Sequence, residues 1–182
     1  MISAIVSLDT TIAQALFAMR SPEFVALFLW ITLLGNAIVI TVIALSMGVI
    51  LVKHKESEYI VGLSLSLFGV LASSYLLKIL VERARPHPHF RAIDVAGYSL
   101  PSMHAAVALA VYGFLIYVVY TRLHPPRHRL FLALMLALFI ILIGFSRMYL
   151  GVHYLSDVII GFCIGALWLA FGVLYVVYNR KP

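Results

Sequence analysis

Cations, histidines and a serine are concentrated in three short segments of an otherwise apolar chain. The segments are Lys78–Pro86, Pro101–His104 and Ser146–Asp157. They contribute three cations in particular: Lys78, Arg85 and Arg147. Arginine presents a planar fork that matches phosphate oxygens, and lysine presents a point charge. Any one of these residues would also suit an anchor at the edge of an apolar span, but the three together favour a site for an anion such as phosphate.

Ser102 stands at the expected start of a helix, directly after Pro101. At a helix start the first backbone N–H groups have no partner inside the helix, and the helix dipole favours an anion. The hydroxyl of Ser102 adds a further hydrogen-bond donor. Combined with the three cations, these groups predict a cradle for a phosphate group.

His153 and Asp157 are four residues apart, so on a helix they would share one face and their side chains would meet. Asp157 would then hold one ring nitrogen of His153 as N–H, leaving the other as a nucleophile or base. The alternative is an aspartate that only caps a helix near an interfacial histidine. His104, two residues beyond Ser102, is placed to protonate a leaving oxygen. Two histidines beside a phosphate cradle favour phosphoryl transfer through a covalent phosphohistidine.

The composition indicates a membrane protein. Of the 182 residues, 64% are hydrophobic and 11% are charged, whereas a soluble domain is about 45–50% apolar and about 25% charged. The formal net charge is +6, but most basic residues lie at the ends of apolar segments rather than in a solvated stripe. Nucleic acid is therefore not expected as a partner. The single cysteine, Cys163, excludes an intrachain disulfide.

Five apolar stretches are candidates for crossing a membrane. They are Phe24–Val52, Tyr59–Leu77, Met103–Tyr120, Leu130–Phe145 and Val158–Tyr178. The first is longer than one span needs and contains Gly35-Asn36 as a candidate break, while the fourth is short and requires flanking residues. We therefore expect an all-α fold, a polytopic transmembrane helical bundle of about five to six membrane helices. It should form a single domain over residues 1–182.

The N-terminal segment, residues 1–19, is expected to form an amphipathic helix at the membrane interface. Apolar residues recur in it at helical spacing: Ile5, Leu8, Ile12, Leu16 and Met19. Such spacing is typical of a helix that lies in the interface plane. The segment lacks a basic start and carries Asp9, so no cleaved signal peptide is expected.

Basic residues in the loops predict the orientation of the bundle. Five spans place 7 of the 13 basic residues on one side: Lys53, Lys55, Arg122, Arg127, Arg129, Arg180 and Lys181. The other side holds Arg20, Lys78, Arg83, Arg85, Arg91 and Arg147. The positive-inside rule then puts the C-terminus in the cytoplasm and all three chemistry-bearing segments outside. We expect a bacterial cytoplasmic (inner) membrane with the active site on its periplasmic or extracytoplasmic face.

The three segments resemble the signature of the type 2 phosphatidic acid phosphatase (PAP2) family, whose site is similar to that of vanadium haloperoxidases. The family pattern is Lys-x₆-Arg-Pro, then Pro-Ser-Gly-His, then Ser-Arg-x₅-His-x₃-Asp. The first part is matched by Lys78, Arg85 and Pro86, and the third by Ser146, Arg147, His153 and Asp157. In the second part, Met103 replaces the glycine. Methionine keeps the backbone N–H but adds bulk beside the phosphate, which should affect how the phosphate fits.

This resemblance implies a role for each residue. His153 would be the nucleophile, Asp157 its orienting partner and His104 the general acid. The phosphate would be bound by Lys78, Arg85, Ser102, the backbone of Met103, and Arg147. No metal ion and no cofactor would be required.

The expected function is that of a membrane lipid phosphatase acting on a lipid phosphate or pyrophosphate, with other membrane lipids around it. Undecaprenyl pyrophosphate is the favoured substrate. The alternatives are phosphatidylglycerophosphate or phosphatidate, and lipid A. A function of another class, non-catalytic binding or transport of a lipid phosphate, would need the cations but not the imidazole of His153.

Overall fold

The protein is all-helical in a computed structural model, which describes residues 2–122 and 125–180. The helices are α1 (Ile2–Ala18), α2 (Pro22–Leu33), α3 (Ala37–Lys53), α4 (Ser57–Val81), η1 (Pro88–Phe90), α5 (Met103–Arg122), α6 (Pro126–Tyr149) and α7 (Leu155–Asn179). Five stretches are long and apolar enough to cross a membrane, with α2 and α3 counted as one. The expected polytopic helical bundle is confirmed. The short fourth stretch does gain flanking residues, since α6 is 24 residues long.

The break between α2 and α3 falls at Gly35-Asn36, the candidate break in the sequence. Asn36 starts α3, because its side-chain oxygen accepts a hydrogen bond from the backbone N–H of Val39 at 2.8 Å. A side chain at Gly35 would lie 2.6 Å from Ile143 and 3.3 Å from the ring of His104. The glycine therefore lets the corner between the two helices approach α5 and α6 closely.

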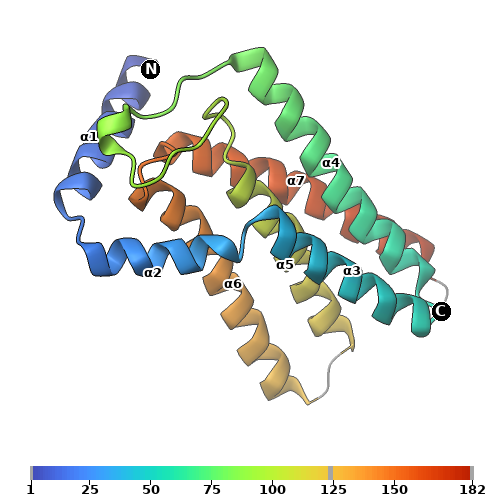
Figure 1. Cartoon of the computed structure of the whole chain (residues 1–182). Helices are drawn as coiled ribbons and strands as arrows, with labels where there is room; N and C mark the ends of the chain where they lie inside the picture. Colours follow the sequence, from blue (N-terminus) through green and yellow to red (C-terminus); the bar gives the residue numbers. More distant parts are fainter. Residues whose placement is uncertain (1, 123–124, 181–182) are drawn as a thin grey trace.

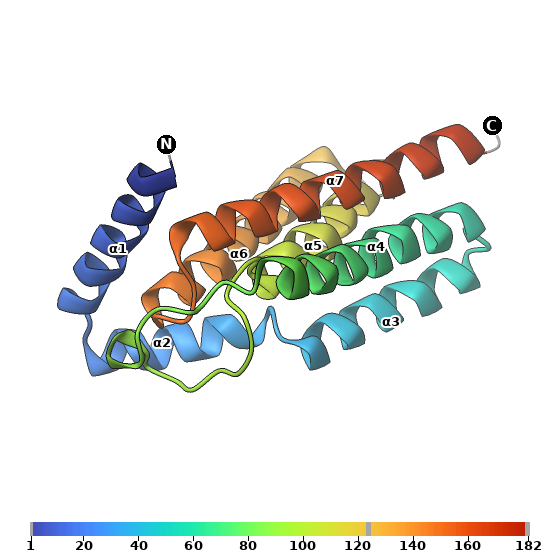
Figure 2. The ribbon, with the colours of Figure 1, turned by 90° about the horizontal axis from the view of Figure 1, so that it is seen from above.

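Helix α7 packs against α4 and α5 (Figures 1 and 2). The contact with α5 is close because Gly161 and Gly165 face the α5 backbone. A β-carbon at Gly161 would lie 2.6 Å from the carbonyl oxygen of Ser102, and one at Gly165 would lie 2.5 Å from that of Ala106. This close packing, which small residues permit between membrane helices, brings the start of α7 beside the start of α5.

Helix α1 lies across the end of the bundle where α2 begins and α4 ends (Figures 1 and 2). The expected helix is confirmed, and three residues of its apolar stripe, Ile5, Leu8 and Met19, are exposed. The side that packs on the protein carries Asp9, which is only 2% exposed. Its location at a membrane interface stays a prediction.

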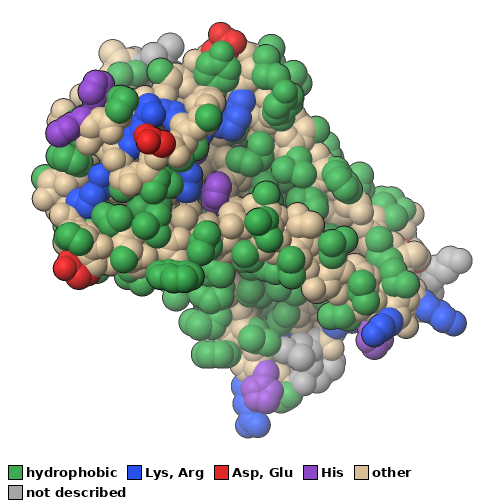
Figure 3. All heavy atoms as spheres, viewed as in Figure 1, with side chains coloured by type: hydrophobic (Ala, Val, Ile, Leu, Met, Phe, Trp, Pro, Cys, Tyr) green, Lys and Arg blue, Asp and Glu red, His purple; other side chains and the backbone are tan. Residues whose placement is uncertain are grey.

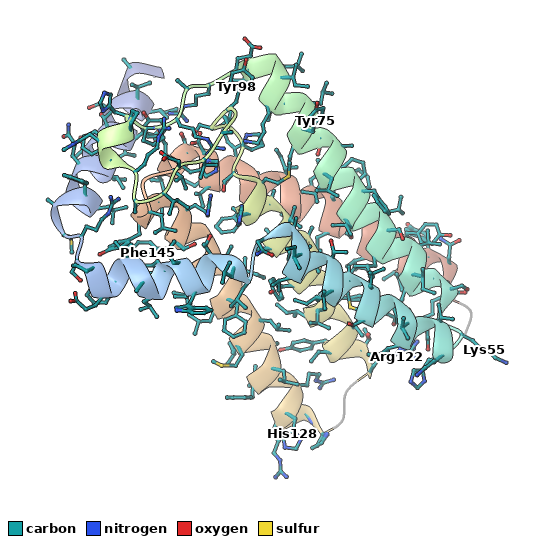
Figure 4. All side chains as sticks on the ribbon, in the orientation of Figure 1. Lys55, Tyr75, Tyr98, Arg122, His128 and Phe145 are labelled. Atoms are coloured by element: carbon teal, nitrogen blue, oxygen red, sulfur yellow. The ribbon has the colours of Figure 1, made fainter. Side chains whose placement is uncertain are left out.

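Basic residues lie at both ends of the bundle. Tyr98 lies at one end, whereas Lys55, Arg122 and His128 lie at the opposite end (Figure 4). We call the first of these the site end, because the three chemistry-bearing segments meet there. In Figure 3 basic side chains gather at the site end near α1, and a second group lies at the opposite tips. Lys181, one of the residues used to predict orientation, lies outside the described residues.

Candidate active site

The start of α5 forms the floor of the site. Ser102 directly precedes α5 and is fully buried. Its backbone N–H donates to the carbonyl oxygen of Asp157 at 3.0 Å, which ties the start of α5 to the first turn of α7. Its hydroxyl has no hydrogen-bond partner among the described residues. A buried hydroxyl beside the free N–H groups of a first helical turn is well suited to bind a phosphate oxygen.

Arg147 approaches the same point from the last turn of α6. Its side chain is 3% exposed, and one terminal nitrogen donates to the hydroxyl of Thr32 in α2 at 2.8 Å. Its Nε has no hydrogen-bond partner in the described part of the chain. An arginine buried with unused donors favours an anionic partner.

Lys78 and Arg85 hold the loop that connects α4 to α5. Lys78 Nζ donates to the carbonyl oxygen of Tyr98 at 2.7 Å. The Nε of Arg85 donates to the carbonyl oxygen of Gly97 at 2.9 Å, and its Nη1 donates to that of Val152 at 2.8 Å. Burial, and secondarily the neighbouring Arg91, lower the pKa of Arg85 from its ordinary value. Carbonyl oxygens thus offset part of the cost of these desolvated cations.

His153 lies in the turn before α7, so the expectation that it shares a helix face with Asp157 was wrong. The two side chains nevertheless meet, with His153 Nδ1 3.5 Å from Asp157 Oδ2, which is long for a hydrogen bond. They meet because Asp157 caps α7: its Oδ2 accepts from the backbone N–H of Tyr154 at 2.8 Å. Asp157 therefore does both things that the sequence offered as alternatives: it caps a helix and it lies beside His153.

The other ring nitrogen of His153 faces the cations. His153 Nε2 is 3.1 Å from Arg85 Nη1. An arginine can only donate, so Nε2 accepts this bond and the ring proton belongs on Nδ1, facing Asp157. Burial lowers the pKa of His153 to about 4, even though the contact with Asp157 acts in the opposite direction. The imidazole is therefore neutral near pH 7 and keeps a lone pair on Nε2.

Six of the eight predicted site residues line one cavity of about 470 Å³: Lys78, Arg85, Met103, His104, Arg147 and His153. The other two, Ser102 and Asp157, are fully buried behind it. His104 comes from the first turn of α5, close to Gly35. The fold thus brings all eight predicted residues to one place at the site end.

The remainder of this cavity is apolar and runs between α3 and α4. Its lining there includes Ile40, Ala44, Leu45, Leu67 and Phe68. A second cavity, of about 550 Å³, continues between the same two helices towards Lys53 and shares four of its lining residues with the first. We call the apolar part of the first cavity and the second cavity together the α3–α4 groove. The groove extends the cationic end of the first cavity as a long apolar channel. This combination suits a ligand with a charged head and an apolar tail.

Several polar residues of the site were not expected from the sequence. Arg83 Nη1 donates to Asp157 Oδ1 at 2.7 Å, and Arg83 Nη2 donates to Asp9 Oδ2 at 2.7 Å. Ser99 donates to the other oxygen of Asp157. A signal was present for Asp9, since a lone acid in an apolar helix at a membrane is costly and calls for a partner. There was less indication for Arg83 in the sequence, because it looked like one of several basic residues expected on the outer side of the membrane.

The chain is similar to known proteins of one family. The family model of the PAP2 superfamily matches residues 59–181. Phosphatidylglycerophosphatase B from Bacillus subtilis (strain 168) is 28% identical over 167 residues, covering 91% of this chain and 81% of the relative.

Two solved structures are similar. One is a transmembrane PAP2-type phosphatidylglycerolphosphate phosphatase from Bacillus subtilis, with a TM-score of 0.88 and 25% identity over 98% of this chain and 89% of that one. The other, Aquifex aeolicus LpxE, has a TM-score of 0.74 and 21% identity over 92% of this chain and 96% of that chain, and supports the fold alone.

The low pKa of His153 predicts a pH-dependent contribution to stability. The unfolded chain binds a proton to this histidine near pH 6.5, whereas the folded protein does so only near pH 4. Stability contributed by the neutral ring is therefore present above pH 6.5 and is lost as the pH falls towards 4, by about 3 kcal/mol at most. Thermal unfolding in detergent at pH 4.5 and pH 7 should show this dependence. It should be smaller in His153→Asn, and equal dependence in both proteins would contradict the assigned protonation state.

Proposed function

Because this chain belongs to the PAP2 superfamily and is a membrane lipid phosphatase, we propose that His153 is the nucleophile and that the predicted residues around it perform the reaction. One observation carries the proposal. The cationic cavity that contains His153 and His104 opens into the apolar α3–α4 groove. A phosphate bound in the cationic cavity would therefore be attached to a lipid tail that lies in the groove.

In the proposed reaction, His153 Nε2 attacks the phosphorus and the bond from phosphorus to the leaving oxygen breaks. Lys78, Arg85 and Arg147 offset the charge on the three remaining phosphate oxygens, which is where most of the catalytic stabilisation of phosphoryl transfer arises. Ser102 and the start of α5 donate hydrogen bonds to the same oxygens.

His104 gives a proton to the leaving oxygen. It then takes one from the water that attacks the phosphohistidine, so that inorganic phosphate leaves and both histidines are restored.

The role of Asp157 is to offset the positive charge that develops on His153. Attack through Nε2 turns the ring into an imidazolium, whose Nδ1–H faces Asp157 Oδ2. The contact of 3.5 Å would shorten as that charge forms, since hydrogen bonds to ionised groups are shorter and stronger. The low pKa of the free imidazole is therefore consistent with an acidic neighbour, because Asp157 acts when the ring becomes charged.

The lipid tail enters sideways, between α3 and α4. Along α3 the groove runs from Ala37 to Lys53, a distance of about 24 Å at 1.5 Å per residue. This is more than half of a hydrocarbon core of roughly 30 Å. A tail that enters from the bilayer exchanges one apolar environment for another, so the groove selects a lipid by the fit of its tail and directs its phosphate to the cationic cavity.

Among lipid substrates, we place phosphatidylglycerophosphate first. The support is the similarity over most of the chain to a phosphatidylglycerophosphatase. Undecaprenyl pyrophosphate, the first choice from the sequence, remains the second candidate, because the α3–α4 groove is longer than one leaflet and suits a long tail. Phosphatidate and lipid A complete the set of substrates to be compared.

We propose further that the site end faces the extracytoplasmic side of a bacterial cytoplasmic membrane, with the C-terminus in the cytoplasm. The support is the distribution of basic residues. At the opposite end they include Lys55, in the turn before α4, and Arg127, in the first turn of α6, and both are exposed. At the site end Arg83, Arg85 and Arg147 are engaged in hydrogen bonds within the protein.

The mechanism predicts that His153→Ala abolishes phosphate release while lipid binding is retained. The change removes the nucleophile but leaves the three cations, so the rate should fall by at least about 10³-fold. Release of inorganic phosphate from the four lipids in detergent, with excess chelator, measures this. His128→Ala, an exposed histidine at the opposite end, should behave like the unchanged protein. Turnover by His153→Ala equal to that of the unchanged protein would overturn the mechanism.

The groove predicts that tail length affects activity through Gly48. A side chain added there would meet no atom within 4 Å, and the residue lines the second cavity. Gly48→Phe should therefore fill the far part of the groove without disturbing the packing. We expect kcat/KM for a long-tailed lipid phosphate to fall about tenfold, a loss of about 1.4 kcal/mol, because the added ring occupies the space of the tail. The kcat/KM for a six-carbon analogue should be unchanged.

Val42→Phe is the matched control for the groove, since Val42 is 57% exposed on α3 and lines neither cavity. If Gly48→Phe and Val42→Phe had equal effects on the long-tailed substrate, the tail would not lie in the α3–α4 groove.

The orientation predicts the outcome of reporter fusions. Fusions at Lys55 and Arg127 should report the cytoplasm, and a fusion near Arg91 should report the external side. Alkaline phosphatase and fluorescent protein reporters distinguish the two compartments. The reverse pattern would place the chemistry at the inner leaflet.

A further inference from the structure

Asp9 is buried and is the only charged residue of helix α1. Its Oδ1 accepts from the backbone N–H of Ser156 at 3.0 Å, and its Oδ2 accepts from the hydroxyl of Ser156 at 2.5 Å and from Arg83 Nη2 at 2.7 Å. Only 2% of its surface is exposed. Both oxygens are therefore committed to groups that adjoin Asp157.

Arg83 connects Asp9 to the active site. One arm of its guanidinium binds Asp9, while the other binds Asp157 Oδ1 at 2.7 Å and the hydroxyl of Ser156 at 2.6 Å. Its guanidinium also lies over the ring of Tyr154, 4.4 Å from the ring centre. The planar fork allows one side chain to bridge two carboxylates. Contacts thus run without a gap from Asp9 through Arg83 and Asp157 to His153.

The charges along this path have a consequence for His153. Burial opposes the charge on Arg83, but Asp9 and Asp157 outweigh that effect and raise its pKa, so the guanidinium is positive. Paired with Arg83 alone, Asp157 would belong to a neutral pair. With Asp9 added, the three groups carry a net charge of −1, which can offset the imidazolium that forms on His153. In a poorly hydrated site such a charge acts strongly.

Asp9 also restrains the position of Arg83. Without Asp9, both arms of the guanidinium would be free to turn towards Asp157 and compete with His153 for its oxygens. The hydrogen bond that Asp9 accepts from the backbone N–H of Ser156 fixes the first turn of α7, from which Asp157 projects. Charge and geometry therefore act in the same direction.

We infer that Asp9 is a positioning residue for the phosphatase reaction, which acts through Arg83 and Ser156 to hold Asp157 in the orientation and charge state that His153 requires. The inference rests on the proposed roles of His153 and Asp157. It makes the N-terminal helix α1 a part of the catalytic apparatus rather than only an anchor at the membrane.

The test is Asp9→Asn, which keeps the size of the side chain and removes its charge. Residues that orient a catalytic group through hydrogen bonds typically contribute about 10- to 100-fold, so kcat should fall by about that factor. The KM for the lipid phosphate should change by less than about twofold, because the phosphate-binding residues Lys78, Arg85 and Arg147 do not contact Asp9. Single-turnover labelling of the phosphohistidine should slow by the same factor as kcat. Asp9→Glu, which keeps the charge, should retain a larger share of the original kcat than Asp9→Asn does.

Phe17→Ala is the control for a merely structural role. Phe17 holds α1 by packing against His89 at 4.8 Å and Phe90 at 5.3 Å between ring centres, and it does not contact the polar path. It should lower the thermal midpoint in detergent while leaving kcat close to that of the unchanged protein. An equal loss of kcat in Phe17→Ala and Asp9→Asn at equal thermal midpoints would overturn the inference.

A kcat within twofold of the unchanged protein for Asp9→Asn, when His153→Ala is inactive, would also overturn it. In that case the proposed function would stand. Activity in His153→Ala would remove the proposed function itself, and the two failures are thereby distinguished.

Discussion

The buried carboxylate of Asp157 holds together the parts of the chain that form the proposed active site. Its two side-chain oxygens accept from Arg83, Ser99 and the backbone of Tyr154, and its carbonyl oxygen accepts from the backbone of Ser102. These bonds join the segment after α4, the loop before α5, and the start of α7. An unpaired buried carboxylate would be costly, so the same bonds that satisfy Asp157 also fix the positions of Ser102 and His153.

The cations of the site pose the opposite problem, since each must remain charged near the edge of an apolar bundle. Carbonyl oxygens offset part of that cost for Lys78 and Arg85, and a hydroxyl does so for Arg147. Carbonyls and hydroxyls carry only partial charges, so the cavity between these side chains keeps a positive potential. That residual potential, confined where water is scarce, favours a phosphate group over a neutral lipid head.

Much of this arrangement could be predicted from the sequence because it depends on local spacing. Uncharged runs fix the spans, Gly35-Asn36 marks a break, and motif residues at the ends of successive spans must reach one face. The contact between Asp9 and Arg83 could not be predicted in this way, since it joins residues 74 positions apart and depends on how α1 crosses the bundle. The location of His153 was also misjudged: a spacing of four fits a helix face, but Asp157 instead caps the helix and reaches back to the preceding turn.

The fold separates chemistry from substrate choice. The reacting groups are held by hydrogen bonds at the site end, where the helices and loops are interlocked. The α3–α4 groove is instead lined by side chains that make few polar contacts, and α3 can vary there without disturbing Asp157. Met103 lies where the two parts meet, since it lines the cavity beside His104. In the proposed binding mode its side chain lies beside the head of the lipid rather than its tail. Changes in α3 should therefore alter which lipid is accepted, whereas changes around Asp157 should alter the rate for every lipid.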